Sequence, residues 1–322
     1  MKEAVYPVFA TVLGAIIGSF LNACIHRMPR NIPLGNPRRS FCPSCQRTIP
    51  WYENLPILSW LALRGKCAGC GSRIPVRYLC VEVLTAGLFL LAWTRYGLPL
   101  APVYWIFLAL LVAATFIDIE HFIIPDEITK GGTAAGIILS VLVPEMMQTS
   151  SRIGALGLSV AGAALGYGML WLIVQFGKLA FGKKRHAFPA AEPFVWRRDG
   201  DTASITVGEE TLEWIDIFGR ESDELVVEGA TVRVAGQPLE NATLRFRYDR
   251  LTAGTASHAL DDLDVIEGTI TAITIPREAM GFGDVKFIAA VGAFLGWKAV
   301  IFTISAASFI GCFAALAGLF LA

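Results

Sequence analysis

Charged residues are scarce in this chain. They make up 17% of its 322 residues, whereas soluble globular domains contain about 25%. The shortage falls in apolar runs of about 17–25 residues, the length that spans a bilayer, and polar blocks separate these runs. No ten-residue alternation typical of a membrane β-barrel is present. Because only helices or closed barrels satisfy backbone groups in lipid, the sequence predicts an α-helical polytopic membrane protein.

The apolar runs predict about seven membrane spans. They lie near residues 5–25, 79–95, 101–117, 128–144, 153–181, 284–297 and 299–321. The sixth run is short, and its boundaries are weak. No small-residue cleavage site follows the first run, so we expect this segment to stay in the mature protein and not to be removed as a signal peptide.

Basic residues are concentrated in the first polar block. Residues 27–77 contain nine Arg or Lys side chains and one acidic side chain, Glu53. The positive-inside rule places this loop in the cytoplasm and the N-terminus outside. Alternation of the spans then places Asp118, the basic cluster at residues 183–185 and Asp284 on the cytoplasmic side. A nucleic-acid-binding patch is the alternative, but a membrane loop explains the charge more simply.

The polar blocks divide the chain into five parts. These are a first span at 1–27, a small cytoplasmic domain at 28–77, spans two to five at 78–185, a soluble cytoplasmic β-rich insert at 186–277, and the last spans at 278–322. In the insert, β-branched residues and alternation predict strands at 204–207, 224–227, 230–234, 243–248 and 268–275, with a turn at 236–238. Acidic residues outnumber basic ones roughly two to one there. We expect an accessory or regulatory domain, since no catalytic constellation is present in it.

Four of the seven cysteines form two CxxC pairs. Cys42 and Cys45 form one pair, and Cys67 and Cys70 form the other. This spacing is typical of a structural zinc site with four thiolate ligands. A metal would also stabilise a loop of about 50 residues that has little core of its own. A redox pair and unligated thiols are the alternatives.

Two aspartates stand at the ends of apolar runs. Asp118 ends one run, and Asp284 closes the sequence Gly281-Phe282-Gly283-Asp284 directly before another. A carboxylate at the rim of a bilayer is costly and is a functional-site hypothesis by default. Two of them on the same side could share one proton, as in aspartic proteases. The alternative is a pair of solvated helix-end carboxylates, with Asp284 as a helix N-cap.

Five motifs, in order along the chain, resemble those of the type IV prepilin peptidases, which are bifunctional leader peptidases and N-methyltransferases. The motifs are Gly18–Asn22 with His26–Pro29, Ser40–Cys45 with Ile49–Trp60, Arg73–Tyr78 with Glu82, Asp118–Asp126, and Gly281–Lys286. Leu79 departs from the proline that is usual in the family, and the β-rich insert is not a standard part of it. The chain also stops at Ala322, short of the family's last helix, so we expect a shortened variant or an incomplete chain.

The resemblance implies a GxGD-type aspartic peptidase of the bacterial cytoplasmic membrane. It would cleave the basic leader of type IV prepilins or pseudopilins at the cytoplasmic face and then methylate the new N-terminal amine from S-adenosylmethionine. Asp118 and Asp284 are the expected catalytic pair, and the pattern does not assign the two roles between them. Gly281 and Gly283 are expected to let the backbone break and approach the substrate closely.

Four further residues receive supporting roles. Asp126 is more typical of a helix cap than of a catalyst, although it lies close enough in sequence to Asp118 to shape the site. Lys286 is expected to hold a carboxylate or a lipid phosphate, or to snorkel. Glu82 is expected to pair with a base such as Arg77, with a part in methyl transfer as the alternative. No Gly-rich loop marks a methyl-donor site, so Glu53, in the zinc loop, is the candidate cofactor contact.

Other classes of protein make different predictions. A presenilin-like intramembrane protease would carry a Tyr-Asp pair and a Pro-Ala-Leu motif in its helices, and neither lies in an apolar run. A non-enzymatic membrane scaffold with zinc and β interaction domains would not need either aspartate. A transporter would show an inverted repeat, and none is visible. The expected partners are prepilin substrates and membrane lipids, not nucleic acid, and the sequence does not identify a ligand of the β-rich insert.

Overall fold

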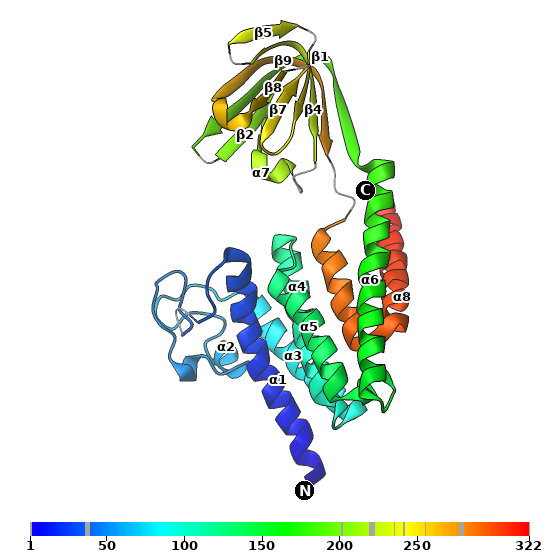
Figure 1. Cartoon of the computed structure of the whole chain (residues 1–322). Coiled ribbons are helices and arrows are strands. Elements are labelled where there is room, and N and C mark those ends of the chain that lie inside the picture. The colour runs from blue at the N-terminus through cyan, green and yellow to red at the C-terminus, as the bar shows by residue number, and fades with distance from the viewer. Residues whose placement is uncertain are drawn as a thin grey trace. The chain divides into compact units, whose positions relative to one another are not determined.

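The chain folds into two compact units. The computed structural model describes residues 2–35, 39–200, 202–218, 223–234, 236–240, 242–254, 256–276 and 280–321. The first unit comprises residues 1–171 and 281–322 and is helical, and the second comprises residues 172–280 and contains a β-sheet (Figure 1). A separate β-rich unit was predicted, and the structure confirms it.

Long apolar helices make up most of the first unit, and the last of those before the sheet, α6 (Arg152–Phe181), continues into the second unit. They are α1 (Lys2–Arg27), α3 (Val76–Tyr96), α4 (Leu100–His121), α5 (Asp126–Leu142), α6 and α8 (Phe282–Leu321). Among the described residues, all of these except α5 are long and apolar enough to cross a membrane. Gly296, with φ 76° and ψ 178°, interrupts the helical conformation of α8 near the end of the predicted span 284–297. A total of about seven spans requires α5 and both halves of α8 to cross, and it stays a prediction.

Glycines allow two pairs of these helices to approach closely. A Cβ atom added to Gly18 of α1 would lie 2.7 Å from the Cα of Glu82 in α3. A Cβ atom added to Gly292 of α8 would lie 2.1 Å from the carbonyl oxygen of Gly162 in α6. Small residues at such contacts are a common basis of helix packing in membranes. The second contact fixes the half of α8 that carries Asp284.

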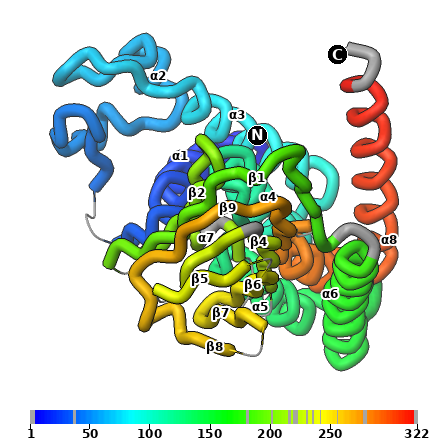
Figure 2. The backbone as a smooth tube through the Cα atoms, turned by 90° about the horizontal axis from the view of Figure 1, so that it is seen from above, coloured from blue at the N-terminus to red at the C-terminus, as the bar shows by residue number. Residues whose placement is uncertain are grey.

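A long loop connects α1 to α3, and Figure 2 follows it through the short helix α2. The loop contains η1 (Met28–Arg30), η2 (Trp51–Glu53) and α2 (Leu58–Ala62), and a further single turn, η3 (Pro144–Met147), precedes α6. Two isolated β-bridges, Phe41 to Thr48 and Lys66 to Arg73, close the two CxxC segments of the loop. The loop is therefore folded around its cysteines, although it contains little regular secondary structure.

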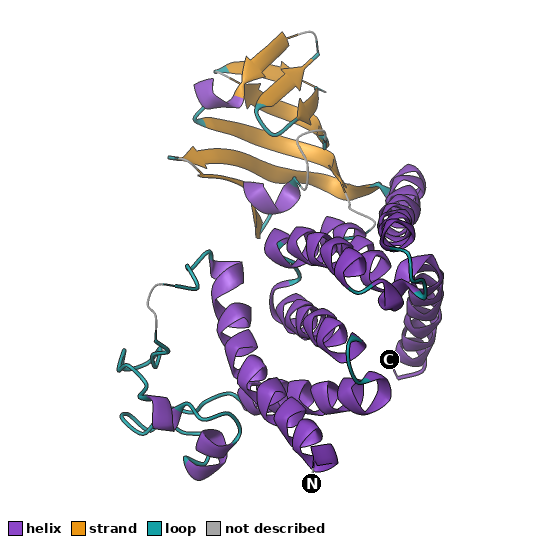
Figure 3. Ribbon diagram, turned by 60° about the horizontal axis from the view of Figure 1, so that its bottom comes forward, coloured by secondary structure: helices purple, strands orange, loops and turns teal. Residues whose placement is uncertain are grey.

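An antiparallel sheet forms the second unit (Figure 3). Its strands are β1 (Lys183–Asp199), β2 (Thr202–Val207), β3 (Glu210–Glu213), β4 (Leu225–Val234), β5 (Gln237–Glu240), β6 (Thr243–Phe246), β7 (Arg250–Ala253), β8 (Ala256–Ala259) and β9 (Val265–Pro276). They are arranged in the order β3-β2-β1-β9-β4-β6-β7-β8, with β5 paired to β4. The short helices α7 (Trp214–Ile217) and η4 (Leu260–Asp262) interrupt the strands. Buried aromatic and aliphatic side chains from both halves of the sheet form one core.

The sequence missed the longest strand. β1 starts at Lys183, three residues before the predicted boundary, and pairs with β9 from Lys183 opposite Pro276 to Arg197 opposite Val265. Prolines within β1 obscured the strand pattern, and the structure accommodates them near a shift in register between Ala187 and Glu192.

Two other details of the sheet correct the prediction. The predicted strands at 224–227 and 230–234 form the single strand β4, which is irregular at Gly229. The predicted turn at 236–238 is shorter than expected, because Gln237 and Pro238 already belong to β5.

Candidate active site and metal centre

Asp118 lies in the last turn of α4, and its side chain is exposed. The helix ends at Phe122, which adopts a left-handed conformation with φ 55°, and the Phe122 N–H donates to the Asp118 carbonyl oxygen over 2.8 Å. This arrangement is a common way to satisfy the last carbonyl groups of a helix. The exposed Asp118 carboxylate therefore lies at the very end of α4.

Asp284 lies in the first turn of α8 and is half-buried. Its N–H donates to the Gly281 carbonyl oxygen over 3.3 Å. A Cβ atom on Gly281 would lie 3.3 Å from Asp284 Oδ2, and one on Gly283 would lie 3.2 Å from the Cβ of Ile124. The expected backbone break falls at Gly281, where the helix starts. Gly283 is instead inside the first turn of α8, where its lack of a side chain permits close packing.

The structure brings the two aspartates together. The charge of Asp118 acts on the Asp284 carboxyl group across the gap between α4 and α8. The chain segments that carry them share one hydrophobic cluster, to which Ile117, Ile124 and Phe287 contribute. Residues 166 positions apart in sequence are therefore close enough for their charges to interact.

Asp126 connects the start of α5 to the start of α8. Its Oδ1 accepts a hydrogen bond from Lys286 Nζ over 2.6 Å, and its Oδ2 lies 2.6 Å from Lys130 Nζ. Lys130 and Lys286 together hold the pKa of Asp126 at about 2, below its usual range. Asp126 was expected to be a helix cap, but the N-cap position is Pro125 and no side chain caps this helix. Lys286 holds a carboxylate, which was one of the roles considered for it.

Glu82 does not pair with Arg77, which corrects the sequence-based expectation. Arg77 donates to Glu120, at the end of α4, and so links the start of α3 to the helix that carries Asp118. Glu82 is buried, and its Oε2 accepts a hydrogen bond from the Ile57 N–H over 2.6 Å. Glu82 thus holds the loop that contains the cysteines against α3.

Glu53 is neutralised within the loop. Arg47 donates to its two carboxylate oxygens over 3.0 and 2.8 Å. Such bidentate pairs are strong and geometrically specific. Glu53 is therefore committed to Arg47, which weakens the expectation that it contacts a cofactor.

The four cysteines converge in two similar knuckles. All four Sγ atoms lie within 4.8 Å of one another, and those of Cys42 and Cys70 are 3.9 Å apart. Metal–sulfur bonds of about 2.3 Å in a tetrahedron would place sulfurs about 3.8 Å apart. The knuckles repeat the same backbone contacts, because the N–H of Cys42 donates to Arg47 and that of Cys67 donates to Ser72. This cluster is able to bind a metal ion.

Hydrogen bonds favour the thiolate form of Cys42 and Cys70, whereas burial and the neighbouring thiols raise the pKa of Cys45 to about 11. The Cys45 N–H and the Ser72 hydroxyl hold the pKa of Cys42 at about 6, below its usual range. The hydroxyl and N–H groups of Ser72 also lower the pKa of Cys70. Thiolates are the metal-binding form of cysteine. The sequence analysis assigned no role to Ser72, although its place two residues after the second CxxC pair was a usable signal.

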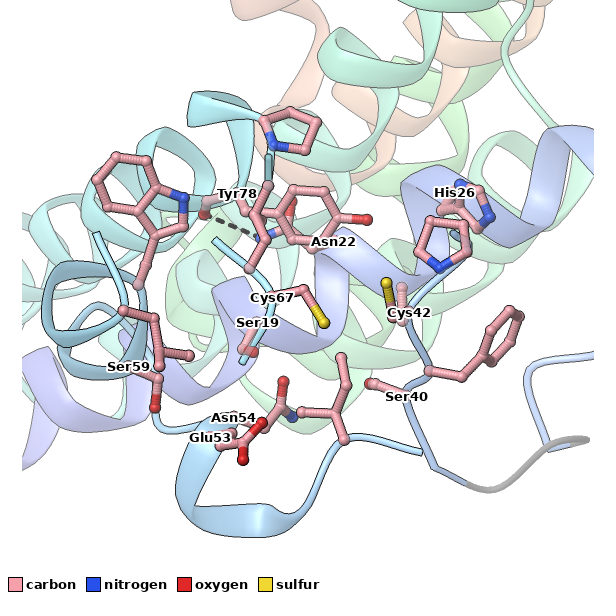
Figure 4. Close-up of a pocket in the computed structure, with 18 of the residues that line it drawn as sticks. Ser19, Asn22, His26, Ser40, Cys42, Glu53, Asn54, Ser59, Cys67 and Tyr78 are labelled. Carbon is pink, nitrogen blue, oxygen red and sulfur yellow. Dashed lines mark hydrogen bonds between the residues drawn. The ribbon is translucent and has the colours of Figure 1, made fainter. Parts of the chain in front are cut away.

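A cavity of about 190 Å³ lies between the cysteine loop and the helices α1 and α3. Figure 4 shows Asn22 and Tyr78 joined by a hydrogen bond on one side of it, with Cys42 and Cys67 nearby and Glu53 and Asn54 on the loop. Ser19 and Asn22 occur in a motif recognised in the sequence, but they were given no function there. Their convergence depends on the close contact of α1 and α3, which the motif alone does not reveal.

Two family models match the chain. The Bacterial Peptidase A24 N-terminal domain matches residues 12–96, and the Type IV leader peptidase family matches residues 105–183 and 264–316. The interruption of the second match, from 184 to 263, falls within the sheet. No solved structure matches the chain.

Curated relatives agree with these matches. A prepilin leader peptidase/N-methyltransferase of Myxococcus xanthus is 47% identical over 137 residues, which cover 42% of this chain and 40% of the relative. A type 4 prepilin-like proteins leader peptide-processing enzyme of Escherichia coli is 44% identical, covering 42% of this chain and 57% of the relative. The chain thus spans about half the length of these two relatives. A prepilin leader peptidase/N-methyltransferase of Pseudomonas putida is 36% identical over 57% of this chain and 69% of the relative.

Proposed function

Because this chain belongs to the type IV leader peptidase family, we propose that it removes the leader peptide of type IV prepilins or pseudopilins and then methylates the new N-terminal amine. The cleavage would take place at the cytoplasmic face of the bacterial inner membrane, with the cysteine loop and the sheet on the same side. The observation that carries the proposal is that Asp118 and Asp284, each at a helix end, lie close enough for their charges to interact.

The two carboxyl groups supply acid and base for hydrolysis. Close carboxyls titrate as a coupled pair, so one is protonated while the other is ionised. The ionised group takes a proton from water, whose oxygen bonds to the scissile carbonyl carbon, while the protonated group hydrogen-bonds the carbonyl oxygen. The C–N bond then breaks, and the departing amine receives a proton. Asp126, Lys286 and the Arg77–Glu120 pair would hold the helix ends in place.

The four cysteines would hold a structural zinc ion. The four sulfurs lie within 4.8 Å of one another, which supports this assignment, and the similar backbone contacts of the two knuckles agree with it. Zinc would stabilise the loop that connects α1 and α3. Glu82 connects the loop to α3, and Arg77 connects α3 to the end of α4. An ordered loop would therefore also hold these two helix ends in place.

Methyl transfer requires the amine that cleavage releases. S-adenosylmethionine, when bound, would transfer its methyl group to this amine, which would lose a proton. The donor supplies an electrophilic methyl group on a positively charged sulfur. The cavity beside the cysteine loop supports placing this second reaction there.

A peptide cleavage assay tests the peptidase proposal. Purified full-length protein in detergent is incubated with a peptide that carries a basic leader followed by an apolar helix, and the products are measured by intact mass. Asp118→Asn and Asp284→Asn should each abolish cleavage with no loss of thermal stability, because one carboxyl cannot hold both protonation states.

Glu127→Gln is the matched control, because Glu127 is exposed in the first turn of α5, near Asp126. It should cleave at the wild-type rate. Near-normal cleavage by either Asp variant would reject the aspartic mechanism. Cleavage of other membrane peptides without preference for the basic leader would favour a general intramembrane protease.

A further inference from the structure

Glu82 is a buried carboxylate with only neutral partners. Its residue is 7% exposed, and its carboxylate accepts hydrogen bonds from the Ile57 N–H and from the Ser19 hydroxyl. Within the part of the chain that the structure describes, no basic side chain forms an ion pair with it. Buried charges in proteins are normally paired with an opposite charge. This carboxylate is therefore suited to a cationic ligand.

The backbone beside Glu82 is strained. Ile57 has φ 64° and ψ −52°, and the Leu58 N–H donates to the Pro56 carbonyl oxygen over 2.6 Å. This is a γ-turn of the rare, strained type, and a β-branched residue is especially unfavourable in it. The turn directs the Ile57 N–H at Glu82. Strain of this kind is concentrated at binding and catalytic sites.

The cavity next to Glu82 contains two further unpaired polar atoms. Asn22 is 2% exposed, and its Nδ2 donates to the Tyr78 carbonyl oxygen over 3.0 Å (Figure 4). Its Oδ1, and the Nε1 of Trp60, are buried without a partner among the described residues. Both side chains line the cavity. An acceptor and a donor are thus available there, and leaving them unpaired is costly unless a ligand binds them.

These groups define the chemistry of the ligand. Glu82 would offset a positive charge, the Asn22 oxygen would accept a hydrogen bond, and the Trp60 N–H would donate one. The rings of Trp60 and Tyr78 border the same cavity, and aromatic faces attract onium groups. Arg73, an exposed residue that also lines the cavity, would suit a carboxylate. A ligand with an onium centre, an amino group and a carboxylate meets all of these requirements.

We propose that this cavity binds S-adenosylmethionine, with Glu82 opposite the sulfonium and Asn22 accepting a hydrogen bond from the donor. The inference rests on the proposed methyltransferase activity and assigns its donor site. Glu82 replaces Glu53 as the key carboxylate, because Glu53 is already neutralised by Arg47. Tyr78 orients Asn22 through its carbonyl group.

Equilibrium binding to two related ligands tests the assignment. Full-length protein in detergent is titrated with S-adenosylmethionine and with S-adenosylhomocysteine, which has the same adenosine and amino-acid parts but a neutral sulfur. Glu82→Gln keeps an oxygen that can accept from Ile57 and removes the charge. It should weaken S-adenosylmethionine binding at least tenfold and change S-adenosylhomocysteine binding less than twofold. Glu127→Gln, which lies outside the cavity, should change neither affinity more than twofold.

Other variants separate binding from folding. Asn22→Ala should lower the affinity for both ligands about equally, because it removes a hydrogen-bond acceptor and no charge. If Glu82→Gln loosens the loop, metal content and resistance to proteases will fall, and affinity for both ligands will fall together, which would overturn the proposal. Equal affinity of wild type and Glu82→Gln for S-adenosylmethionine would also overturn it, as would an effect confined to the KM of the cleaved peptide. If the wild-type protein neither binds the donor nor methylates, the proposed methyltransferase function itself fails.

Discussion

Replacing Gly292 by alanine should force α8 away from α6. The added Cβ atom would lie 2.1 Å from the Gly162 carbonyl oxygen. An ordinary contact starts at 3.4 Å, so the backbones must separate locally by about 1.3 Å. Neither partner has a flexible side chain that could move aside, because the opposing atom belongs to the backbone of another glycine.

The energetic cost follows from overpacking. Inserting atoms into a close contact typically costs about 1–3 kcal/mol. Alanine also gains up to about 1 kcal/mol over glycine from helix propensity. Gly168→Ala in α6 is the matched control, because its Cβ would meet no atom within 4 Å. The difference in stability between the two variants should therefore be about 1–3 kcal/mol, in favour of Gly168→Ala.

The displacement should also reach the proposed catalytic pair, Asp118 and Asp284. Asp284 lies eight residues before Gly292, or about 12 Å along the helix axis at 1.5 Å per residue. A shift of about 1 Å between reacting groups can lower a rate up to about 100-fold. We therefore expect Gly292→Ala to lower the cleavage rate more than its loss of stability explains.

Thermal unfolding in detergent and peptide cleavage measured by mass are the two assays. Gly162→Ala, whose Cβ would lie 2.4 Å from the Gly292 carbonyl oxygen, should reproduce both effects. The double variant should be less harmful than the sum of the single variants, since residues in contact are not independent. If Gly292→Ala unfolds at the same temperature as Gly168→Ala and cleaves at the wild-type rate, the close contact does not exist.

Two further predictions concern the loop and the sheet. Elemental analysis should find one zinc ion per chain in the wild type and none after Cys42→Ser with Cys67→Ser, and the double variant should become protease-sensitive between residues 39 and 75 and lose methylation more than cleavage. Metal-free wild-type protein from a careful preparation would reject this site. Removing Lys183–Pro276 and closing the gap with a short Gly-Ser linker should leave both reactions detectable by mass but raise the KM for basic leaders at low salt, because an acidic domain attracts them at long range. If that deletion removes methylation but not cleavage, the methyl-transfer site lies on the sheet.

The sequence predicted the parts of the site that depend on local spacing. Two CxxC pairs specify their own turns, so the convergence of the cysteines was foreseeable. The two aspartates were placed correctly at helix ends, because apolar runs reveal where helices meet the membrane rim. Pairing of charges was harder to predict. Both Glu82 and Glu120 were candidate partners of Arg77, and Glu82 is closer in the sequence. The pairing with Glu120 depends on the tertiary contact of α3 with α4, which the sequence does not reveal.

The sequence predicted that the sheet forms a separate domain, but it did not predict the order of its strands. Alternating β-branched residues identified most of its inner strands, whereas prolines and a basic cluster concealed β1. Likewise, the unusual conformation of Ile57 has no local signal. It is imposed by the loop and by Glu82, which lies 25 residues away.

The pairing of Lys183 with Pro276 has a consequence for the history and the engineering of this protein. The first and last residues of the sheet are neighbours on adjacent strands, about 5 Å apart, so the host chain leaves and resumes at nearly one point. A single uninterrupted insertion of DNA would therefore suffice to add the sheet to an ancestor that lacked it. The family match stops after residue 183 and resumes at residue 264, so its interruption contains nearly all of the sheet except β9. The same junction should accept another rigid domain with adjacent ends, such as a marker for electron cryomicroscopy.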